Sequence, residues 1–394
     1  MLQKKHFWLL MIGLFFAIEG FWAVDPRESS AIPAWTRKYG ADCSMCHYPA
    51  VPRLNATGQR FRWMGYRMPD ELGKEPDATN VGNYLAARGR GQYVYANPEE
   101  GNRQSEFQWQ DTTLFYAGPI TKNISAFNEI EREAEDEIGL VAQVQGIWGA
   151  PGRFSTVRFG QFHPLYRVGI GGFDRPTGIS APSLFSDQLT RSEIPFRIAL
   201  DQRGVEVAHV IRDSRFLAQV LNGINETGSG TKGETDTDKD LLIAYEQILD
   251  DLASGFTVYG YRGVWHNGTL PDGFRFYRFG AAANKIFSSG FEVIGGYIRS
   301  SDDRPSGMGE TIQGDSFFVE LEQYLKAPDL ALLARYDWID PDRGTGGDNR
   351  NRKTIGIVRT LQRHLRIAIE GSRSTNDLTH LTDDRATAEV MINF

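Results

Sequence analysis

The feature that most constrains this chain is an alternation of apolar and polar residues that dominates from about residue 80 to the C-terminus. In the clearest segments, apolar residues occupy every second position and charged or amide residues occupy the positions between them; these segments are 138–145, 317–322, 330–338 and 365–370. Successive side chains of a strand point to opposite faces of the sheet, so the pattern predicts strands with one apolar and one polar face. A soluble sandwich has the same period, and the alternation alone does not exclude it.

Three further features favour a transmembrane β-barrel. First, Ala388, Val390, Ile392 and Phe394 alternate up to an aromatic last residue. This ending resembles the closing strand of bacterial outer-membrane barrels, where a terminal Phe is the usual assembly signal; the alternative is a buried terminal strand of a soluble β protein. Second, roughly sixteen such strands fit between residues 83 and 394, an even number as in single-chain bacterial barrels.

Third, the connections alternate in length. Tight connections are predicted near 118–119, 212–213, 288–289 and 328–329, and long polar loops at 224–238, 301–314, 341–350 and 374–384. Barrels place short turns on the periplasmic side and long loops outside, so a sixteen-strand count puts both termini in the periplasm. The longest loop, from about His163 to Thr190, either folds inward and narrows the channel or is an extracellular loop without a special role.

Composition agrees with a barrel. The chain contains 42 Gly, 24 Phe, 15 Tyr and 8 Trp without a long amphipathic helical pattern. The mean hydropathy of −0.39 is that of a soluble protein, but lumen-facing polar residues offset lipid-facing ones in any such average. The net charge of −7 argues against a nucleic-acid partner, because phosphate binding favours a clustered basic face.

The N-terminus predicts an export signal over residues 1–23. Lys4 and Lys5 precede an apolar run from Phe7 to Ile18. That run is too short to span a bilayer as a helix, which needs ~20 residues. Ala23 is a candidate cleavage point, and the alternative reading of the run is an interfacial anchor helix.

Residues 43–47 read Cys-Ser-Met-Cys-His, the C-x-x-C-H pattern of covalent haem attachment. One helical turn brings both thiols to the vinyl groups of one porphyrin, and the next residue then lies under the iron. We therefore expect one covalently bound haem c, with Cys43 and Cys46 as thioethers and His47 as the proximal iron ligand. The alternative is a redox-active or structural C-x-x-C disulfide, but a thioredoxin-like fold would need a βαβ context, and a zinc site would need further ligands nearby.

The distal iron ligand is left open between two methionines. Met68, directly before Pro69, is placed to reach back over the ring, and Met64 is the alternative. Thioether ligation raises the haem potential relative to two histidines. The plainer interpretation of either Met is packing against the haem pocket.

The predicted organisation is a small α-helical c-type cytochrome segment over residues 24–78 and a porin-like barrel over residues 79–394. The stretch from about residue 31 to 68 is too small to bury a haem alone, because domains below ~40 residues need outside support. We therefore expect it to dock in or at the barrel lumen, next to inward-facing polar residues; these are Arg88, Arg90, Gln143 and Gln145.

Residues 33–66 carry a family resemblance. They run Pro-Ala-Trp-Thr-Arg-Lys-Tyr-Gly, then the haem motif, then Pro52-Arg53-Leu54-Asn55, Gly58, Phe61 and Gly65-Tyr66. This resembles the fused monohaem cytochrome–porins of the outer membrane, proposed as iron oxidases in iron-oxidising bacteria. The resemblance is specific over about 35 residues. It implies extracellular Fe(II) as electron donor, haem as first acceptor and a periplasmic c-type cytochrome as next carrier.

The expected function is therefore electron transfer across the outer membrane, with the chemistry of an Fe(II):cytochrome c oxidoreductase. Two alternatives stay open: a haem-bearing conduit that exports electrons to extracellular acceptors, and a diffusion porin whose haem segment is a plug or sensor. Loop residues that could attract Fe(II) are Asp302, Asp303, Asp342 and Asp348, with His163 and His380 as further metal candidates; charged loops of barrels are otherwise simply solvated.

Overall fold

The computed structural model describes residues 33–77, 79–133, 138–165, 177–232, 236–252, 254–268, 273–305, 310–326, 329–362 and 364–394. The predicted export signal lies outside these residues. The first described stretch contains the helices α2 (Pro33–Tyr39) and α3 (Ala56–Trp63) and the single turns η2 (Cys43–Met45) and η3 (Pro69–Glu71), and the single turn η4 (Val81–Asn83) precedes the first strand. Among the described residues, no helix is long and apolar enough to cross a membrane.

Strands make up most of the remainder of the chain. They are β1 (Leu85–Pro98), β2 (Gln104–Pro119), β3 (Ile124–Glu133), β4 (Ile138–Ala150), β5 (Arg153–Phe162), β6 (Gln202–Ile211), β7 (Ser214–Leu221), β8 (Asp240–Ile248), β9 (Gly255–Trp265), β10 (Phe274–Ile286), β11 (Phe291–Asp303), β12 (Thr311–Leu325), β13 (Leu330–Asp340), β14 (Arg350–Gln362), β15 (Leu365–Asn376) and β16 (Leu381–Asn393).

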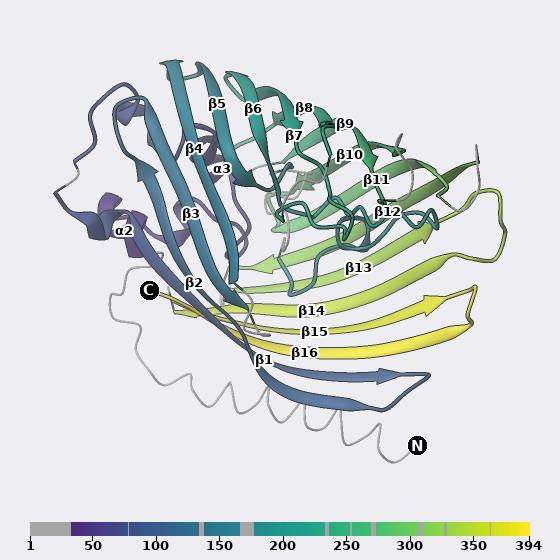
Figure 1. The fold of residues 1–394 in the computed structure, drawn as a ribbon. Coiled ribbons are helices and arrows are strands. Elements are labelled where there is room, and N and C mark those ends of the chain that lie inside the picture. The colour runs from purple at the N-terminus through teal and green to yellow at the C-terminus, as the bar shows by residue number, and fades with distance from the viewer. Residues whose placement is uncertain are drawn as a thin grey trace.

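These strands form one closed antiparallel barrel in sequence order (Figure 1). Closure occurs at β1, which pairs with both β2 and β16; Arg90 lies opposite Asp111 on one side and Met391 on the other. Full closure leaves no strand edge with unpaired backbone groups. The predicted antiparallel barrel of about sixteen strands is confirmed.

Side chains alternate between the two faces as the sequence predicts. On β13, Leu332 and Tyr336 are exposed on the outside, whereas Arg335 and Asp337 are buried inside. The outer surface carries many exposed large apolar side chains, among them Phe159 and Ile243 at 66% and 69% exposure. An apolar exterior around a polar interior is the pattern of a barrel in lipid.

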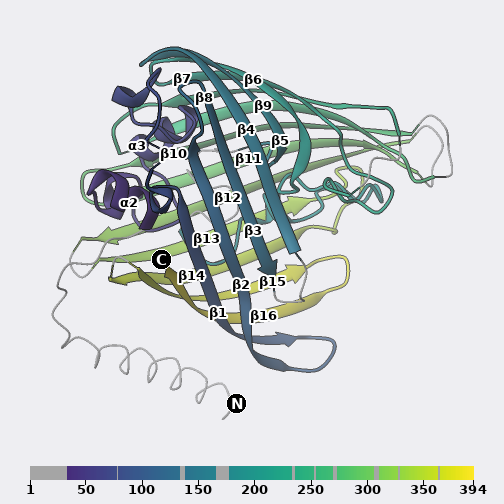
Figure 2. The same ribbon diagram turned by 60° about the vertical axis from the view of Figure 1, so that its left-hand side comes forward.

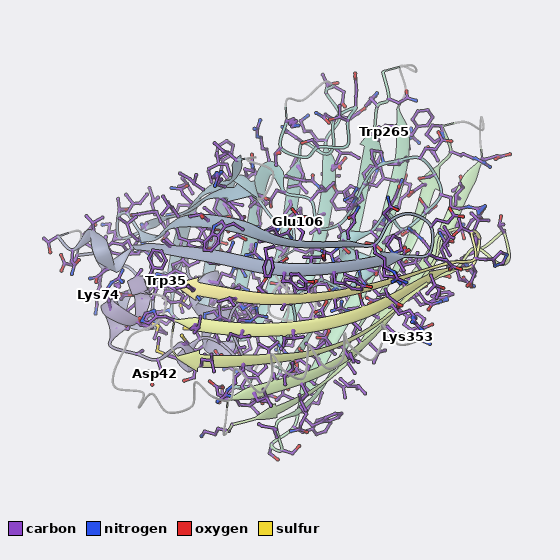
Figure 3. All side chains as sticks on the ribbon, turned by 90° about the horizontal axis from the view of Figure 1, so that it is seen from below. Trp35, Asp42, Lys74, Glu106, Trp265 and Lys353 are labelled. Atoms are coloured by element: carbon purple, nitrogen blue, oxygen red, sulfur yellow. The ribbon has the colours of Figure 1, made fainter. Side chains whose placement is uncertain are left out.

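The two ends of the barrel differ in their connections. Short turns, such as 212–213 between β6 and β7, gather at the end that holds α2, α3 and the C-terminus, and longer loops gather at the other end (Figure 1). Figure 3 shows Trp35 and Asp42 at the first end and Lys353 at the second.

Two of the predicted long loops are wrong in their bounds. In segment 301–314, residues 301–303 belong to β11 and residues 311–314 to β12, and segment 374–384 is strand except for residues 377–380. Polar residues extend these hairpins because cross-strand pairs replace apolar contacts there. Arg373 and Asp384, for example, face each other on β15 and β16 with 2.6 Å between Nε and Oδ1.

The connection between β5 and β6 is described at residues 163–165 and 177–201, and the second of these parts folds into the barrel, as one of the two interpretations of this loop predicted (Figure 1). This second part includes the short helix α4 (Ser183–Ser186), with Phe185 fully buried. The Ser183 backbone N–H donates to Asp337 at 2.8 Å, and the Arg335 guanidinium donates to the Ser180 carbonyl at 2.9 Å. Charged lumen residues of β13 therefore hold the loop inside.

Candidate functional site

The N-terminal segment, residues 33–77, lies in the short-turn end of the barrel, with α2 and α3 one above the other at the opening (Figure 2). Aromatic side chains join it to the wall. Trp35 packs edge-on against Phe61 at 5.0 Å between ring centroids and stacks on Tyr66 at 5.5 Å, and Tyr66 stacks on Phe127 of β3 at 5.3 Å. Such ring pairs add about 0.5–1.5 kcal/mol each beyond the area they bury. This segment is called the plug below.

Polar contacts hold the plug from several sides of the lumen. Arg53 makes two of these contacts. Its side chain is 2% exposed, and its guanidinium binds Glu292 of β11 and Glu322 of β12. Four other side chains donate hydrogen bonds between the plug and the barrel: Gln145 to the Trp63 carbonyl, Arg67 to the Thr121 and Ile124 carbonyls, Arg60 to the Asp213 carboxylate, and the Trp35 indole to the Ala117 carbonyl. Because these contacts come from opposite walls, they fix the plug across the lumen.

Asn55 organises the haem-attachment motif locally. Its side-chain oxygen accepts from the Gly58 N–H at 3.0 Å, which caps α3, and its amide nitrogen donates to the Ser44 and Met45 carbonyls at 3.0 and 3.1 Å. Gly58 packs so closely that an added Cβ would lie 2.3 Å from the Cys46 carbonyl oxygen. One residue therefore fixes the start of α3 to the turn that carries the two cysteines.

His47 is held in one orientation and one charge state. Its Nδ1 lies 2.9 Å from the Arg53 carbonyl oxygen, so that nitrogen carries the proton and Nε2 keeps its lone pair. Burial lowers the pKa of His47 to about 4, against the opposite effect of this hydrogen bond. The imidazole is thus neutral at physiological pH. Iron-binding histidines have this arrangement, with the second ring nitrogen bonded to a carbonyl or carboxylate.

Cys46 and His47 line a cavity of about 400 Å³ between the plug and the barrel wall, within the ~300–1,000 Å³ range of cofactor sites. The wall side comes from β1 to β4 and β16, and the connection between β5 and β6 contributes His163 and Asp201. Aromatic and aliphatic groups line it together with charged ones; the polar lining residues are Arg62, Arg88, Arg90, Glu129, Glu131, Gln143 and Asn393. Arg88, Arg90 and Gln143 lie where the sequence expectation puts them.

Cys43 and Cys46 are free thiols in this structure. Burial, together with the neighbouring Cys43 sulfur, raises the pKa of Cys46 to about 11. Redox C-x-x-C motifs have the opposite property, a depressed thiol pKa, so the surroundings of Cys46 do not suit disulfide exchange. Two thiols, a neutral oriented imidazole and a partly apolar cavity beside Cys46 and His47 fit a covalently bound haem.

The two methionines named as distal ligands do not line this cavity. Met64 is 4% exposed and packs with Trp63, Ile147 and Phe154. Met68 packs beside Phe61, and its backbone N–H donates to Glu71 at 2.8 Å. Both therefore sit in packing positions in this structure, and their role as ligands stays a prediction.

Glu71 forms polar contacts with three other residues of the plug. Its carboxylate lies 2.6 Å from Lys38 Nζ and accepts from the Tyr39 hydroxyl at 2.6 Å. Burial alone would raise the pKa of Glu71, but the hydrogen bonds from Lys38, Tyr39 and the Met68 N–H outweigh it and lower the pKa. Because all three partners belong to the plug, the ionised carboxylate stabilises the folded form of the plug.

The expectation that acidic loop residues attract cations is wrong for two of them. Asp302 is fully buried and binds the Arg278 guanidinium, while Thr190 and Ser192 donate to it. Asp348 is 2% exposed, with the Arg191 guanidinium at 3.4 Å. Both carboxylates are buried beside a guanidinium, because the lumen and the inward loop cover them, and sequence composition does not reveal this.

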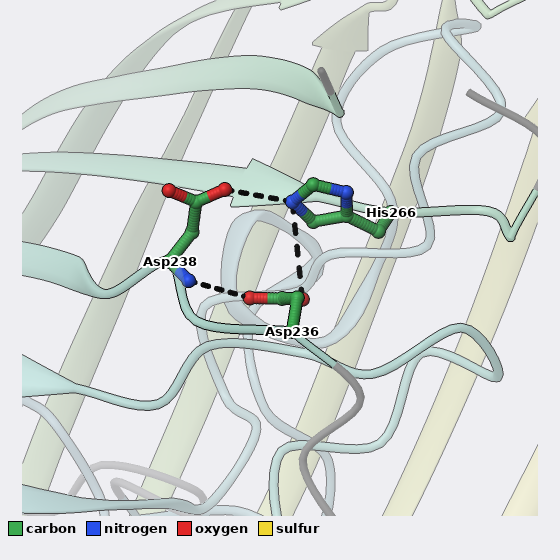
Figure 4. A group of neighbouring side chains, drawn as sticks. All are labelled: Asp236, Asp238 and His266. Atoms are coloured by element: carbon green, nitrogen blue, oxygen red, sulfur yellow. Dashed lines mark hydrogen bonds and ion pairs between the residues drawn. The ribbon is translucent and has the colours of Figure 1, made fainter. Parts of the chain in front are cut away.

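Among the described residues, one group brings together three side chains that could bind a metal, two carboxylates and one imidazole (Figure 4). His266 Nε2 lies 2.7 Å from Asp238 Oδ2 and 4.0 Å from Asp236 Oδ2, and the Asp238 N–H donates to Asp236. The group lies at the long-loop end and joins the β7–β8 loop to the end of β9. These three side chains connect the two loops through their own contacts, and no metal is needed to explain the arrangement.

Comparison with known proteins supports the barrel alone. No protein-family model and no curated protein matches the chain. Solved structures do: the anion-selective porin from Comamonas acidovorans has a TM-score of 0.59 at 10% identity and covers 79% of this chain and 98% of its own. The outer membrane channel DcaP of Acinetobacter baumannii gives 0.58 at 11%, covering 82% and 100%, and Pseudomonas putida OprB gives 0.55 at 8%, covering 79% and 94%. The chain therefore has the fold of the outer-membrane porins.

Proposed function

We propose that this protein is an outer-membrane electron-transfer barrel in which Cys43, Cys46 and His47 hold one haem c at the inner face of the plug. The observation that carries the proposal is that Cys46 and His47 of the C-x-x-C-H motif line a lumen cavity, with His47 already oriented by the Arg53 carbonyl. The bound group would supply one-electron transfer from extracellular Fe(II), which leaves as Fe(III), to a periplasmic c-type cytochrome.

Different residues of the chain would hold the haem-attachment motif, keep the plug in place and face the bound porphyrin. Asn55 and the Arg53 carbonyl hold the motif, and the anchors of Arg53 to Glu292 and Glu322 keep the plug across the lumen. Arg62, Arg88 and Arg90 line the cavity and are the cations closest to the carboxylates of a bound porphyrin. Arg88 and Arg90 are ion-paired with Asp111 and Glu131, so a porphyrin carboxylate would share them with these groups. The plug lies at the short-turn end, which in outer-membrane barrels is periplasmic, and a carrier on that side would meet the haem segment from below.

A diffusion porin with a plug is the second candidate, and the comparisons favour it, because the similar solved structures are named as porins and channels. The two candidates make opposite demands on the lumen: solutes need a continuous aqueous path, whereas electrons do not. The plug and the inward loop, both held by bonds across the lumen, favour the electron-transfer reading.

The decisive experiment uses the full-length protein purified from an outer membrane and oxidised. Intact mass, read beside that of a Cys43→Ala/Cys46→Ala variant, reports covalent haem. Anaerobic addition of Fe(II) should then reduce the haem, and planar bilayers should show little conductance. A mass without haem removes the proposal entirely. Haem that stays oxidised with Fe(II) removes the iron donor, and a strongly negative potential would favour electron export. High conductance would establish the diffusion porin.

A further inference from the structure

We infer that His163 is the second axial ligand of the haem iron, and that Asp201 positions it. The inference rests on the proposed function, because it concerns the same cavity. His163 follows the last residue of β5 and Asp201 precedes the first residue of β6, and the ladder between these strands ends at the pair Phe162 and Gln202. Residues far apart in sequence are thus brought together where the inward loop begins and ends.

His163, like His47, has an oxygen atom beside its Nδ1. His163 Nδ1 lies 2.7 Å from Asp201 Oδ1, a contact that the structure holds as an ion pair and not as a hydrogen bond. This leaves Nε2 as the ring nitrogen through which iron would be bound. A carboxylate behind a histidine is the commonest means of fixing a metal-binding imidazole, and it also makes the ligand more basic. His47 has a backbone carbonyl in this position. The two imidazoles line one cavity, His47 from the plug and His163 from the inward loop.

The other side chains of the cavity are weaker candidates. Met391 also lines it, but the adjacent strands β1 and β15 fix its backbone in the barrel wall, and no carboxylate or carbonyl orients a thioether. Tyr66 is stacked between Trp35 and Phe127. Met64 and Met68 lie in packing clusters away from the lining. Among the described lining residues, only His47 and His163 offer an imidazole.

Two consequences follow for the protein. Two histidine ligands give a lower potential than a histidine and a methionine, so the donor must be a correspondingly stronger reductant. The same bond would also link the plug to the β5–β6 connection, two segments that lie far apart in the chain, so that haem binding would stabilise the loop that narrows the lumen.

The test uses the full-length holoprotein and three variants. His163→Ala removes the ligand, Asp201→Asn removes its partner, and His380→Asn is the control: His380 is exposed at φ 57°, a backbone conformation that Asn adopts readily. The readouts are haem content by mass, electronic absorption and electron paramagnetic resonance of the oxidised protein, none of which depends on Fe(II) oxidation.

We expect the parent protein and His380→Asn to be low-spin without the red charge-transfer band that methionine ligation gives. His163→Ala should keep its covalent haem but become high-spin, and added imidazole should restore the low-spin spectrum. Asp201→Asn should stay low-spin with a higher midpoint potential. A low-spin His163→Ala, or a methionine band that disappears in Met391→Leu, Met64→Leu or Met68→Leu, overturns the inference and leaves the proposed function standing. A protein without covalent haem overturns both.

Discussion

Arg53 should control whether the plug stays docked. Its guanidinium joins the plug to Glu292 and Glu322, and all three side chains are at most 2% exposed. An Arg53→Met variant keeps a side chain of similar length but leaves two buried carboxylates without their cation. Removing one partner of a buried ion pair costs about 3–5 kcal/mol, because the other charge is left desolvated.

The structure indicates where within this range the cost of Arg53→Met should lie. Asn284 donates to Glu292 at 2.7 Å and continues to do so in the variant, so we expect the lower part of that range. When the plug leaves, the two carboxylates become hydrated, and the penalty therefore applies to the docked state alone. A cost of about 3 kcal/mol shifts the docking equilibrium roughly a hundredfold toward the undocked state.

Hydrogen exchange with mass spectrometry measures this shift directly. The amides of Gln59, Met64 and Tyr66 are bonded within the plug and should exchange faster in Arg53→Met, whereas the β11–β12 ladder should keep its protection. Adding Glu292→Gln and Glu322→Gln removes the uncompensated charges and should restore much of the protection. Unchanged exchange of the plug in Arg53→Met would refute the reasoning, as would equal exchange in the single and triple variants.

Three further results are expected. Gly58→Ala should lower the yield of haem-bearing protein severalfold by mass, since its Cβ would collide with the Cys46 carbonyl, whereas Gly260→Ala, which meets open space, should not. Lowering the pH should destabilise the plug through Glu71, whose pKa is lower in the folded protein than in the unfolded chain. The stability that Glu71 contributes is therefore complete above the unfolded carboxyl pKa of about 4.3 and disappears as the pH falls through the folded value. Hydrogen exchange of the plug in Glu71→Gln should lack that pH dependence. Phe394→Ser should reduce the amount of assembled barrel in the membrane, measured by heat-modifiable mobility, while barrel that does assemble melts as the parent does.

The barrel could be predicted from sequence because its signal is local. A two-residue period assigns each side chain to a face, and Arg335 and Asp337 are inside because their neighbours are apolar and outside. The ends of strands were less predictable. Residues 301–303 and 374–376 are polar like loop residues. The first group nevertheless pairs with β12 and the second with β14 and β16, and such pairing depends on residues of another strand.

The candidate site was only partly predictable for the same reason. The C-x-x-C-H motif is contiguous, so its chemistry can be read directly from the sequence. The role of Asp201 beside His163 follows from strand register, and no local pattern indicates it. Proximity in sequence favoured Met64 and Met68, whereas the folded cavity brings in residues from β1, β4, β16 and the inward loop.

The charges inside the barrel bear on the choice between the two candidate functions. Glu206 binds Arg158 and Arg215, each at 2.5 Å, and Arg215 also binds Glu246 at 2.9 Å; Arg366 binds Glu389 at 2.6 Å. Paired guanidinium and carboxylate groups largely cancel each other's fields, so these arginines give little attraction for a passing anion. Ion pairs that bridge strands do stiffen the wall around a fixed group. Electron transfer benefits from that rigidity, because the ligands keep their positions, whereas a solute path would have to open beside the plug. If the parent protein conducts as freely as Arg53→Met, the plug does not block the path and this argument fails.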